Sequence, residues 1–158
     1  HISNLLFLLI DLPLADLPGK RYFSCKTFTL IVKKILLIED ESLIRSSLAR
    51  ALRVEGVVIS EAQNCKEALE KLRNDGCDLA IVDLFLEDGM HGLKLISEIR
   101  RQVAQVKIIV ITAFGSAEVK EAALREGVDR FYDKPFEIEN IRNAVNELLS
   151  EPVESCAS

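Results

Sequence analysis

The chain is poor in the side chains that build the commonest catalytic and metal sites. Among its 158 residues there is no tryptophan, and His1 and His91 are the two histidines. Its four cysteines form no C-x-x-C pair, and none has a histidine at metal-ligand spacing. A zinc site or a Ser-His-Asp triad is therefore poorly supplied, and free thiols in a reducing cytoplasm are expected.

Long apolar runs and an excess of basic residues are also missing. The run Leu5–Ile10 has six residues, far fewer than the ~20 that a membrane-spanning helix needs. The formal net charge of -5 offers no electrostatic footprint for nucleic acid. With 49% hydrophobic and 28% charged residues, the composition is typical of one soluble domain with a sizeable core. Its acidic balance suits protein partners or metal ions better than nucleic acid, and free thiols agree with the cytoplasm, where we expect the domain to act.

Residues 1–31 lack the regular pattern of the rest of the chain. Their apolar run is soon followed by Asp11 and Pro13, and no basic segment precedes it, as a signal peptide would require. Regular patterning begins near Val32. We expect Val32 to mark the natural start and residues 1–31 to be an extension outside the domain, of upstream or cloning-derived origin. A hydrophobic anchor or helper helix is the alternative.

From Lys33 onward, short apolar runs alternate with segments of helical periodicity. The predicted strands are Lys34–Ile38, Val57–Ile59, Asp78–Asp83, Val106–Ile111 and Val128–Tyr132. The predicted helices carry apolar stripes from Ile44 to Leu52, Cys65 to Leu72, Leu93 to Val103, Ala117 to Glu126 and Ile138 to Leu149. Ser42 and Asn64 are predicted N-caps. This alternation predicts an α/β domain from Val32 to about Ser150, with a parallel sheet, right-handed crossovers and helices on both faces. Residues 151–158 are expected to be a short polar tail.

Polar side chains follow four of the predicted strands. Glu39 and Asp40 follow the first strand, and Asp83 ends the third. Thr112 follows the fourth strand, and Lys134 comes after the fifth. Carboxyl ends of parallel strands open on one edge of the sheet, where open α/β sheets place their chemistry. Each residue alone has an ordinary explanation as a loop or capping residue, but their shared position indicates a functional site.

The predicted cluster carries an electrostatic cost. Two like charges about 4 Å apart at an effective dielectric constant of about 20 repel each other by about 4 kcal/mol. A bound cation removes this cost, and an all-oxygen site with room for water suits Mg²⁺. Mg²⁺ and Lys134 would also neutralise an incoming phosphoryl group, with Asp83 as its carboxylate nucleophile and Thr112 as a hydrogen-bond donor to its oxygens.

Four motifs, in this order, resemble the response-regulator receiver domain of two-component signalling. They read KKILLIEDE, LAIVDLFLEDGMHGL, IIVITAFGS and GVDRFYDKPF and together cover roughly residues 33–150. The resemblance implies the CheY-like, flavodoxin-like doubly wound (βα)5 fold, with a five-stranded parallel sheet in the order 2-1-3-4-5. It also implies a phosphoacceptor signalling domain rather than an enzyme, phosphorylated by a histidine kinase or a histidine phosphotransfer protein.

The resemblance assigns roles to the residues that perform this reaction. Asp83 is expected to be the phosphoacceptor, and Lys134 to pair with the phosphoryl group. Thr112 is expected to bind a phosphoryl oxygen. The Lys134-Pro135 peptide bond is expected to be cis.

The resemblance also implies a magnesium site. Asp40, Asp83 and the backbone carbonyl of Phe85 are expected to ligate Mg²⁺ directly, and Glu39 completes the acidic pair. The pair is Glu-Asp here, where many relatives have Asp-Asp.

Thr112 and Phe131 match the switch pair of the family. On phosphorylation of Asp83, the Thr112 hydroxyl is expected to move toward the phosphoryl group, and the Phe131 ring to turn inward into the vacated space. This would remodel the surface of the fourth helix, fifth strand and fifth helix, from Ala117 to Leu149, for a protein target or a second copy. A plain core aromatic is the alternative for Phe131.

The loop after Asp83 departs from the common family pattern. Glu87 stands where relatives usually have proline, and Gly92 comes one residue later than in the shortest loops. We interpret Glu87 as a solvated loop residue. Phe85 and Phe114 are expected to rim the site with apolar groups and to hinder water attack on an acyl phosphate, which predicts slow self-dephosphorylation.

Other functions remain possible on the same fold. The chain is either a stand-alone receiver or the detached receiver half of a larger regulator, such as a transcription factor. A small Mg²⁺-dependent aspartyl-phosphate phosphatase usually has a second aspartate two residues past the nucleophile, where Phe85 stands here. A flavin-binding electron carrier would need a Ser/Thr/Gly-rich phosphate loop after the first strand, which is missing.

Overall fold

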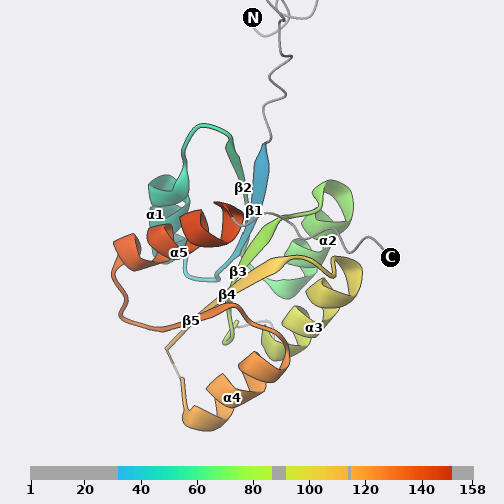
Figure 1. Ribbon diagram of the computed structural model, residues 1–158, viewed down its shortest axis with the longest axis vertical. Coiled ribbons are helices and arrows are strands. Elements are labelled where there is room, and N and C mark those ends of the chain that lie inside the picture. Colours follow the sequence, from blue (N-terminus) through green and yellow to red (C-terminus); the bar gives the residue numbers. More distant parts are fainter. Residues whose placement is uncertain (1–31, 87–91, 114, 151–158) are drawn as a thin grey trace, which may run out of the picture.

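A computed structural model describes residues 32–86, 92–113 and 115–150 of the chain (Figure 1). The strands are β1 (Lys33–Ile38), β2 (Val57–Ala62), β3 (Leu79–Asp83), β4 (Lys107–Thr112) and β5 (Arg130–Asp133). The helices are α1 (Ser42–Leu52), α2 (Cys65–Asp75), α3 (Gly92–Gln102), α4 (Ala117–Arg125) and α5 (Ile138–Ser150). Every predicted element is present, with ends that differ from the prediction by a few residues. The expectations for residues 1–31 and 151–158 lie outside the described residues.

The sheet confirms the predicted fold. Its five strands are all parallel and lie in the order β2-β1-β3-β4-β5. The register pairs Ile38 of β1 with Val82 of β3, and Asp83 of β3 with Ile111 of β4. Thr112 of β4 pairs in turn with Asp133 of β5. The carboxyl ends of four strands therefore meet at the same edge of the sheet.

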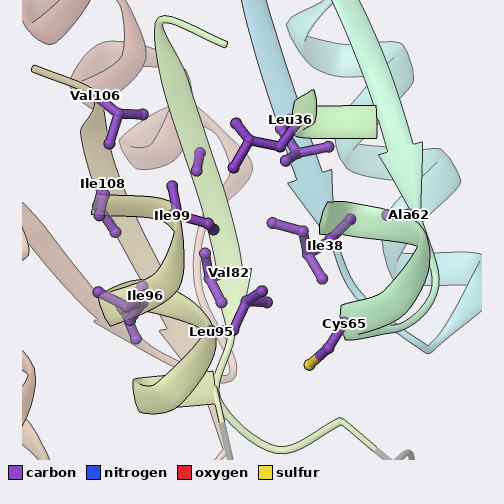
Figure 2. Close-up of a cluster of buried hydrophobic side chains, with 14 of the residues drawn as sticks. Leu36, Ile38, Ala62, Cys65, Val82, Leu95, Ile96, Ile99, Val106 and Ile108 are labelled. Atoms are coloured by element: carbon purple, nitrogen blue, oxygen red, sulfur yellow. The ribbon is translucent and has the colours of Figure 1, made fainter. Parts of the chain in front are cut away.

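Two apolar layers enclose the sheet. Successive side chains of a strand point to opposite faces, so the residues of β1, β3 and β4 divide between the layers. One layer joins the sheet to α2, α3 and α4, and Figure 2 shows part of it, with Ile38 and Val82 facing Leu95 and Ile99. The other layer joins the sheet to α1 and α5 on the opposite side (Figure 1). β3, buried along its whole length, is thus covered on both faces, as its unbroken apolar run predicts.

Two local predictions were wrong in detail. β2 continues to Ala62, beyond the predicted end at Ile59, because its polar residues still pair with β1 through backbone hydrogen bonds at the sheet edge. Glu41, not Ser42, is the N-cap of α1, and its side chain makes no capping hydrogen bond. The Asn64 prediction is confirmed, since its side chain accepts a hydrogen bond from the Glu67 N–H at the start of α2.

No helix within the described ranges is both long and apolar enough to cross a bilayer.

The Lys134-Pro135 peptide bond is cis, as expected.

Gly92 lets α3 approach the end of β3. Its N–H donates to the carbonyl of Leu84 at 3.0 Å. A Cβ at this position would lie 2.5 Å from the Leu84 Cα and 2.8 Å from the Asp83 carbonyl oxygen. These are backbone atoms that cannot move aside without displacing the strand end. The glycine is thus required by the contact that positions the backbone around Asp83.

The Gly92→Ala substitution should destabilise the fold by about 1–3 kcal/mol, the usual cost of forcing extra atoms into a packed interior. Urea unfolding of the purified protein measures this. Lys94→Ala, an exposed change two residues along the same helix, serves as the control and should be close to neutral. Equal stabilities for the two variants would contradict the close approach.

Candidate functional site

The polar residues predicted to share one edge of the sheet do lie together. Glu39 and Asp83 are 2% and 5% exposed, and Thr112 is fully buried. An open pocket of about 530 Å³ lies over this edge, with Asp40, Asp83 and Lys134 in its lining. The fold therefore places acidic and ammonium groups next to an open space, with Thr112 buried at the end of the neighbouring strand β4.

Lys134 joins two of the carboxylates. Its Nζ donates to both oxygens of Glu39, at 3.0 and 2.8 Å, and to Asp83 Oδ2 at 2.7 Å. Its backbone N–H donates to the Thr112 carbonyl at 2.7 Å, which holds the start of the loop after β5 against β4. Asp83 Oδ1 accepts the backbone N–H of Phe85 at 3.0 Å. Charge-assisted hydrogen bonds of this kind order both the acid and the base.

Burial and pairing oppose each other at this site. Burial raises the pKa of the Glu39 carboxyl above its ordinary value, although hydrogen bonding and the positive charge of Lys134 act against this rise. Burial alone would lower the pKa of Lys134, but hydrogen bonds to Asp83 and Glu39 and their negative charges raise it above its ordinary value. Lys134 is therefore held as a cation, and it faces more negative charge than it can neutralise.

The donor set fits a hard divalent cation. Glu39, Asp40 and Asp83 each offer a carboxylate oxygen, and these oxygens lie within 4.8 Å of one another. All are oxygen ligands, as Mg²⁺ prefers, and the pocket leaves room for water. Lys134 engages both oxygens of Glu39 and one of Asp83, whose other oxygen accepts the Phe85 N–H. The division of roles within the acidic pair stays a prediction.

Arg45 is a site residue that the sequence pattern did not indicate. Its Nη1 donates to the backbone carbonyls of Glu39 and Asp40, at 2.6 and 3.1 Å. One signal was available, because an arginine in the first turn of a helix opposes the helix dipole and therefore needs a local reason. Glu41, Ser42 and Ala113 also line the pocket and were not among the predicted site residues, although Ser42 was predicted as an N-cap.

The proposed switch pair lies on one face of the sheet. Thr112 is two residues past Val110 in β4, and Phe131 pairs with Val110 from β5. Phe131 packs against the apolar layer of α2, α3 and α4, and the Lys120 ammonium of α4 lies 5.7 Å from its ring centroid. This is within the range of a cation–π contact.

The two aromatic residues expected to rim the site differ in what is described. Phe85 lines the pocket with Asp83 and is 43% exposed. Phe114 and Glu87 lie outside the described residues. The apolar rim therefore rests on Phe85.

The comparison with known proteins points to one family. The family profile described as "Response regulator receiver domain" matches residues 35–146. The chain is 38% identical over 116 residues to the two-component response regulator PhoP of Pseudomonas aeruginosa. This match covers 73% of this chain and 51% of PhoP. It is 29% identical over 120 residues to the chemotaxis protein CheY of Halobacterium salinarum, and this match covers 76% of this chain and 99% of CheY.

The relatives differ in length. The chain spans about half of PhoP and 30% of a cyclic di-GMP phosphodiesterase of Thermotoga maritima, but nearly all of CheY.

Solved structures show the same fold. A CheY-like receiver domain protein from Methanospirillum hungatei superposes with a TM-score of 0.71 at 29% identity, covering 75% of this chain and 94% of that one. A response regulator from Burkholderia pseudomallei, solved with a phosphorylated aspartic acid and a calcium ion, gives a TM-score of 0.64 at 28% identity. That match covers 77% of this chain and 76% of the Burkholderia chain.

The raised pKa of Glu39 predicts a dependence of stability on pH. The folded state holds the Glu39 proton more tightly than the unfolded state, so this contribution is fully present below the ordinary pKa of 4.5 and is lost as pH rises through the folded pKa. The free energy of unfolding of wild type, relative to Glu39→Gln, should therefore fall as pH rises above 4.5. Urea unfolding across this range in a chelator measures it. The exposed change Glu55→Gln should run parallel to wild type, and a constant or rising difference for Glu39→Gln would refute the interpretation.

Proposed function

This chain belongs to the response regulator receiver domain family of two-component systems, and we propose that it accepts a phosphoryl group on Asp83 from a histidine kinase or a histidine phosphotransfer protein. One observation carries the proposal: Asp83 lies beside a pocket, paired with the Lys134 ammonium and within reach of Asp40. The site residues are thus arranged to bring a nucleophilic carboxylate and cationic charge to the same phosphoryl group. The Burkholderia relative, which carries a phosphorylated aspartic acid, supports the same chemistry.

The proposed transfer is a displacement at phosphorus. An Asp83 oxygen forms the new O–P bond as the P–N bond to the donor histidine breaks, and the ring nitrogen keeps the electron pair. Lys134 gives up part of its contact with Asp83 and meets the phosphoryl oxygens, whose negative charge it offsets. The reaction modifies the domain itself, so we propose a signalling domain that promotes its own phosphorylation and dephosphorylation and has no separate substrate to turn over.

Asp40, Asp83 and the Phe85 carbonyl would hold Mg²⁺ in this proposal, with Glu39 close by. When bound, the ion supplies positive charge to the carboxylates and to the phosphoryl oxygens. The chain itself supplies the crowding of carboxylates within 4.8 Å, which a divalent cation relieves. It also keeps Lys134 charged and in place through Glu39.

The switch and output follow from the contacts around β5. Thr112 is proposed to turn toward the phosphorylated Asp83, and Phe131 to move inward beside it. The Lys120–Phe131 contact would then change, and it joins α4 to β5. Arg130 of β5 also pairs with Glu147 of α5 at 3.3 Å. One contact thus joins β5 to α4 and another joins β5 to α5, and we assign a protein target or a second copy to this α4-β5-α5 surface.

The donor protein needs a docking surface near Asp83, and we assign this role to a groove next to the pocket that Asp83 lines. This groove of about 630 Å³ is lined by Leu43, Ile44 and Phe136 among others, and it also reaches Lys134. Leu43 is 77% exposed, so an apolar side chain is available at its edge. A donor that seats here would bring its phosphohistidine next to the ammonium of Lys134. The proposed donors act in the cytoplasm, where we place the domain.

Whether the domain acts alone or as half of a larger regulator differs among its relatives. The matched segment covers 51% of PhoP, so that response regulator extends well beyond the receiver, whereas 99% of CheY is matched. We propose the receiver domain to be residues 32–150, which either output would share. The phosphatase alternative is disfavoured because Phe85 occupies the place of the second aspartate.

Intact-mass measurement tests the phosphoacceptor directly. Incubation with phosphoramidate and Mg²⁺ should add the mass of one phosphoryl group to wild type. Asp83→Asn should give no adduct, because the amide lacks the nucleophilic oxygen. The control Asp75→Asn removes an exposed carboxylate at the end of α2 and should be phosphorylated like wild type. An adduct on Asp83→Asn, or none on wild type, would refute the proposal.

Phe85 is proposed to lengthen the life of the phosphorylated state. Phe85 lines the pocket together with Asp83, and in this proposal its ring would keep water from one side of the acyl phosphate. The Phe85→Asn variant should lose its phosphoryl group several-fold faster, as followed by mass after removal of the donor. Val54→Asn, which replaces an exposed apolar residue elsewhere, should leave the rate unchanged. Equal rates for wild type and Phe85→Asn would remove the shielding role.

A further inference from the structure

The loop that carries the acidic pair is held by an arginine of the following helix. Arg45 Nη1 donates to the carbonyls of Glu39 and Asp40, at 2.6 and 3.1 Å, and its Nε lies 3.8 Å from Glu61 Oε2 of β2. The side chain is 17% exposed. The guanidinium thus lies largely inside the protein, between the loop after β1 and the edge strand.

The position of Arg45 is otherwise unfavourable. α1 has no acidic residue in its first turn, and its N-cap makes no side-chain hydrogen bond. A cation there opposes the helix dipole, so the contacts of Arg45 with the loop must outweigh this cost. Glu61 supplies a negative partner at the far side of the guanidinium.

In Glu39 and Asp40 the backbone carbonyl and the side-chain carboxylate have different neighbours. The carbonyls of Glu39 and Asp40 face Arg45, while their carboxylates lie in the cluster with Asp83. Mutual repulsion would favour movement of the loop that carries Asp40 away from Asp83. Two hydrogen bonds from one nitrogen restrain both carbonyls together, and so oppose that movement.

We propose that Arg45 is a positioning residue for the acidic pair, which holds the carboxylate of Asp40 toward Asp83 by anchoring the backbone behind it. It acts through the backbone of Glu39 and Asp40 and touches no reacting atom. The consequence for metal affinity rests on the proposed function, whereas the anchoring itself is a property of the metal-free protein.

Anchoring and simple charge compensation predict different results. Lysine keeps the positive charge, but its single ammonium stands nearer the backbone and does not reproduce the contacts of the guanidinium. If Arg45 acts as an anchor, Arg45→Lys fails in the same way as Arg45→Gln. If it acts only as a charge, Arg45→Lys behaves like wild type.

Mg²⁺ titration by calorimetry tests the metal consequence. Arg45→Gln and Arg45→Lys should each weaken Mg²⁺ binding by about tenfold, the lower end of the range for residues that orient metal ligands. Arg50→Gln makes the same charge change at an exposed position of the same helix and should stay within about twofold of wild type. Wild-type affinity in Arg45→Lys or in Arg45→Gln would overturn the proposal.

Urea unfolding in a chelator tests the anchor without metal. Asp40→Asn should stabilise wild type, because it removes repulsion with Asp83. Under anchoring, the same change should stabilise the R45Q background less, since its loop is already free to move. If Arg45 only compensated charge, Asp40→Asn would stabilise the R45Q background more than it stabilises wild type. A gain in the free energy of unfolding that is equal or larger in the R45Q background would therefore overturn the proposal. If wild type bound no Mg²⁺, the metal part of the proposed function would fail, while this comparison would still decide the role of Arg45.

Discussion

The ammonium of Lys134, held between two buried carboxylates, is the interaction on which the rest of this site depends. It joins residues 95 and 51 positions away in the chain, Glu39 and Asp83. Removal of one partner from such a buried pair leaves an uncompensated charge, which is strongly destabilising. Yet the pairing is incomplete, because one cation faces three carboxylates whose oxygens lie within 4.8 Å. That excess of negative charge favours the binding of a divalent cation at the site.

The sheet makes this concentration of charge possible. Its strands bury apolar side chains on both faces, and this burial stabilises the fold enough to offset the repulsion between the charged groups at its edge. The parallel register then brings the ends of β1, β3, β4 and β5 to a common level. The close approach of Gly92 to the backbone of Asp83 and Leu84 shows how tightly this edge is packed. The interior of the sheet thus supplies the stability, and its carboxyl edge carries the candidate site.

The residues around Asp83 form two groups with different effects. Lys134 and Arg45 hold the acidic residues from the side chain and from the backbone, respectively. Phe85 lies on the open side of the pocket, with its backbone N–H bonded to Asp83 and its ring partly exposed. In our proposals, the first group sets the geometry of the site and Phe85 affects the lifetime of the phosphorylated state.

Much of this protein is determined by its sequence alone. The alternation of apolar strands with helical stripes specifies the doubly wound fold, and polar residues at the strand ends indicate Glu39, Asp40, Asp83, Thr112 and Lys134, because both signals are local and periodic. The tertiary structure alone decided three things. It decided that Lys134 engages Glu39 as well as Asp83, that β2 runs on to Ala62, and that Arg45 holds the acidic loop. These three features depend on backbone groups and on distances between residues far apart in the chain. The pattern of side chains along the sequence contains no direct information about either.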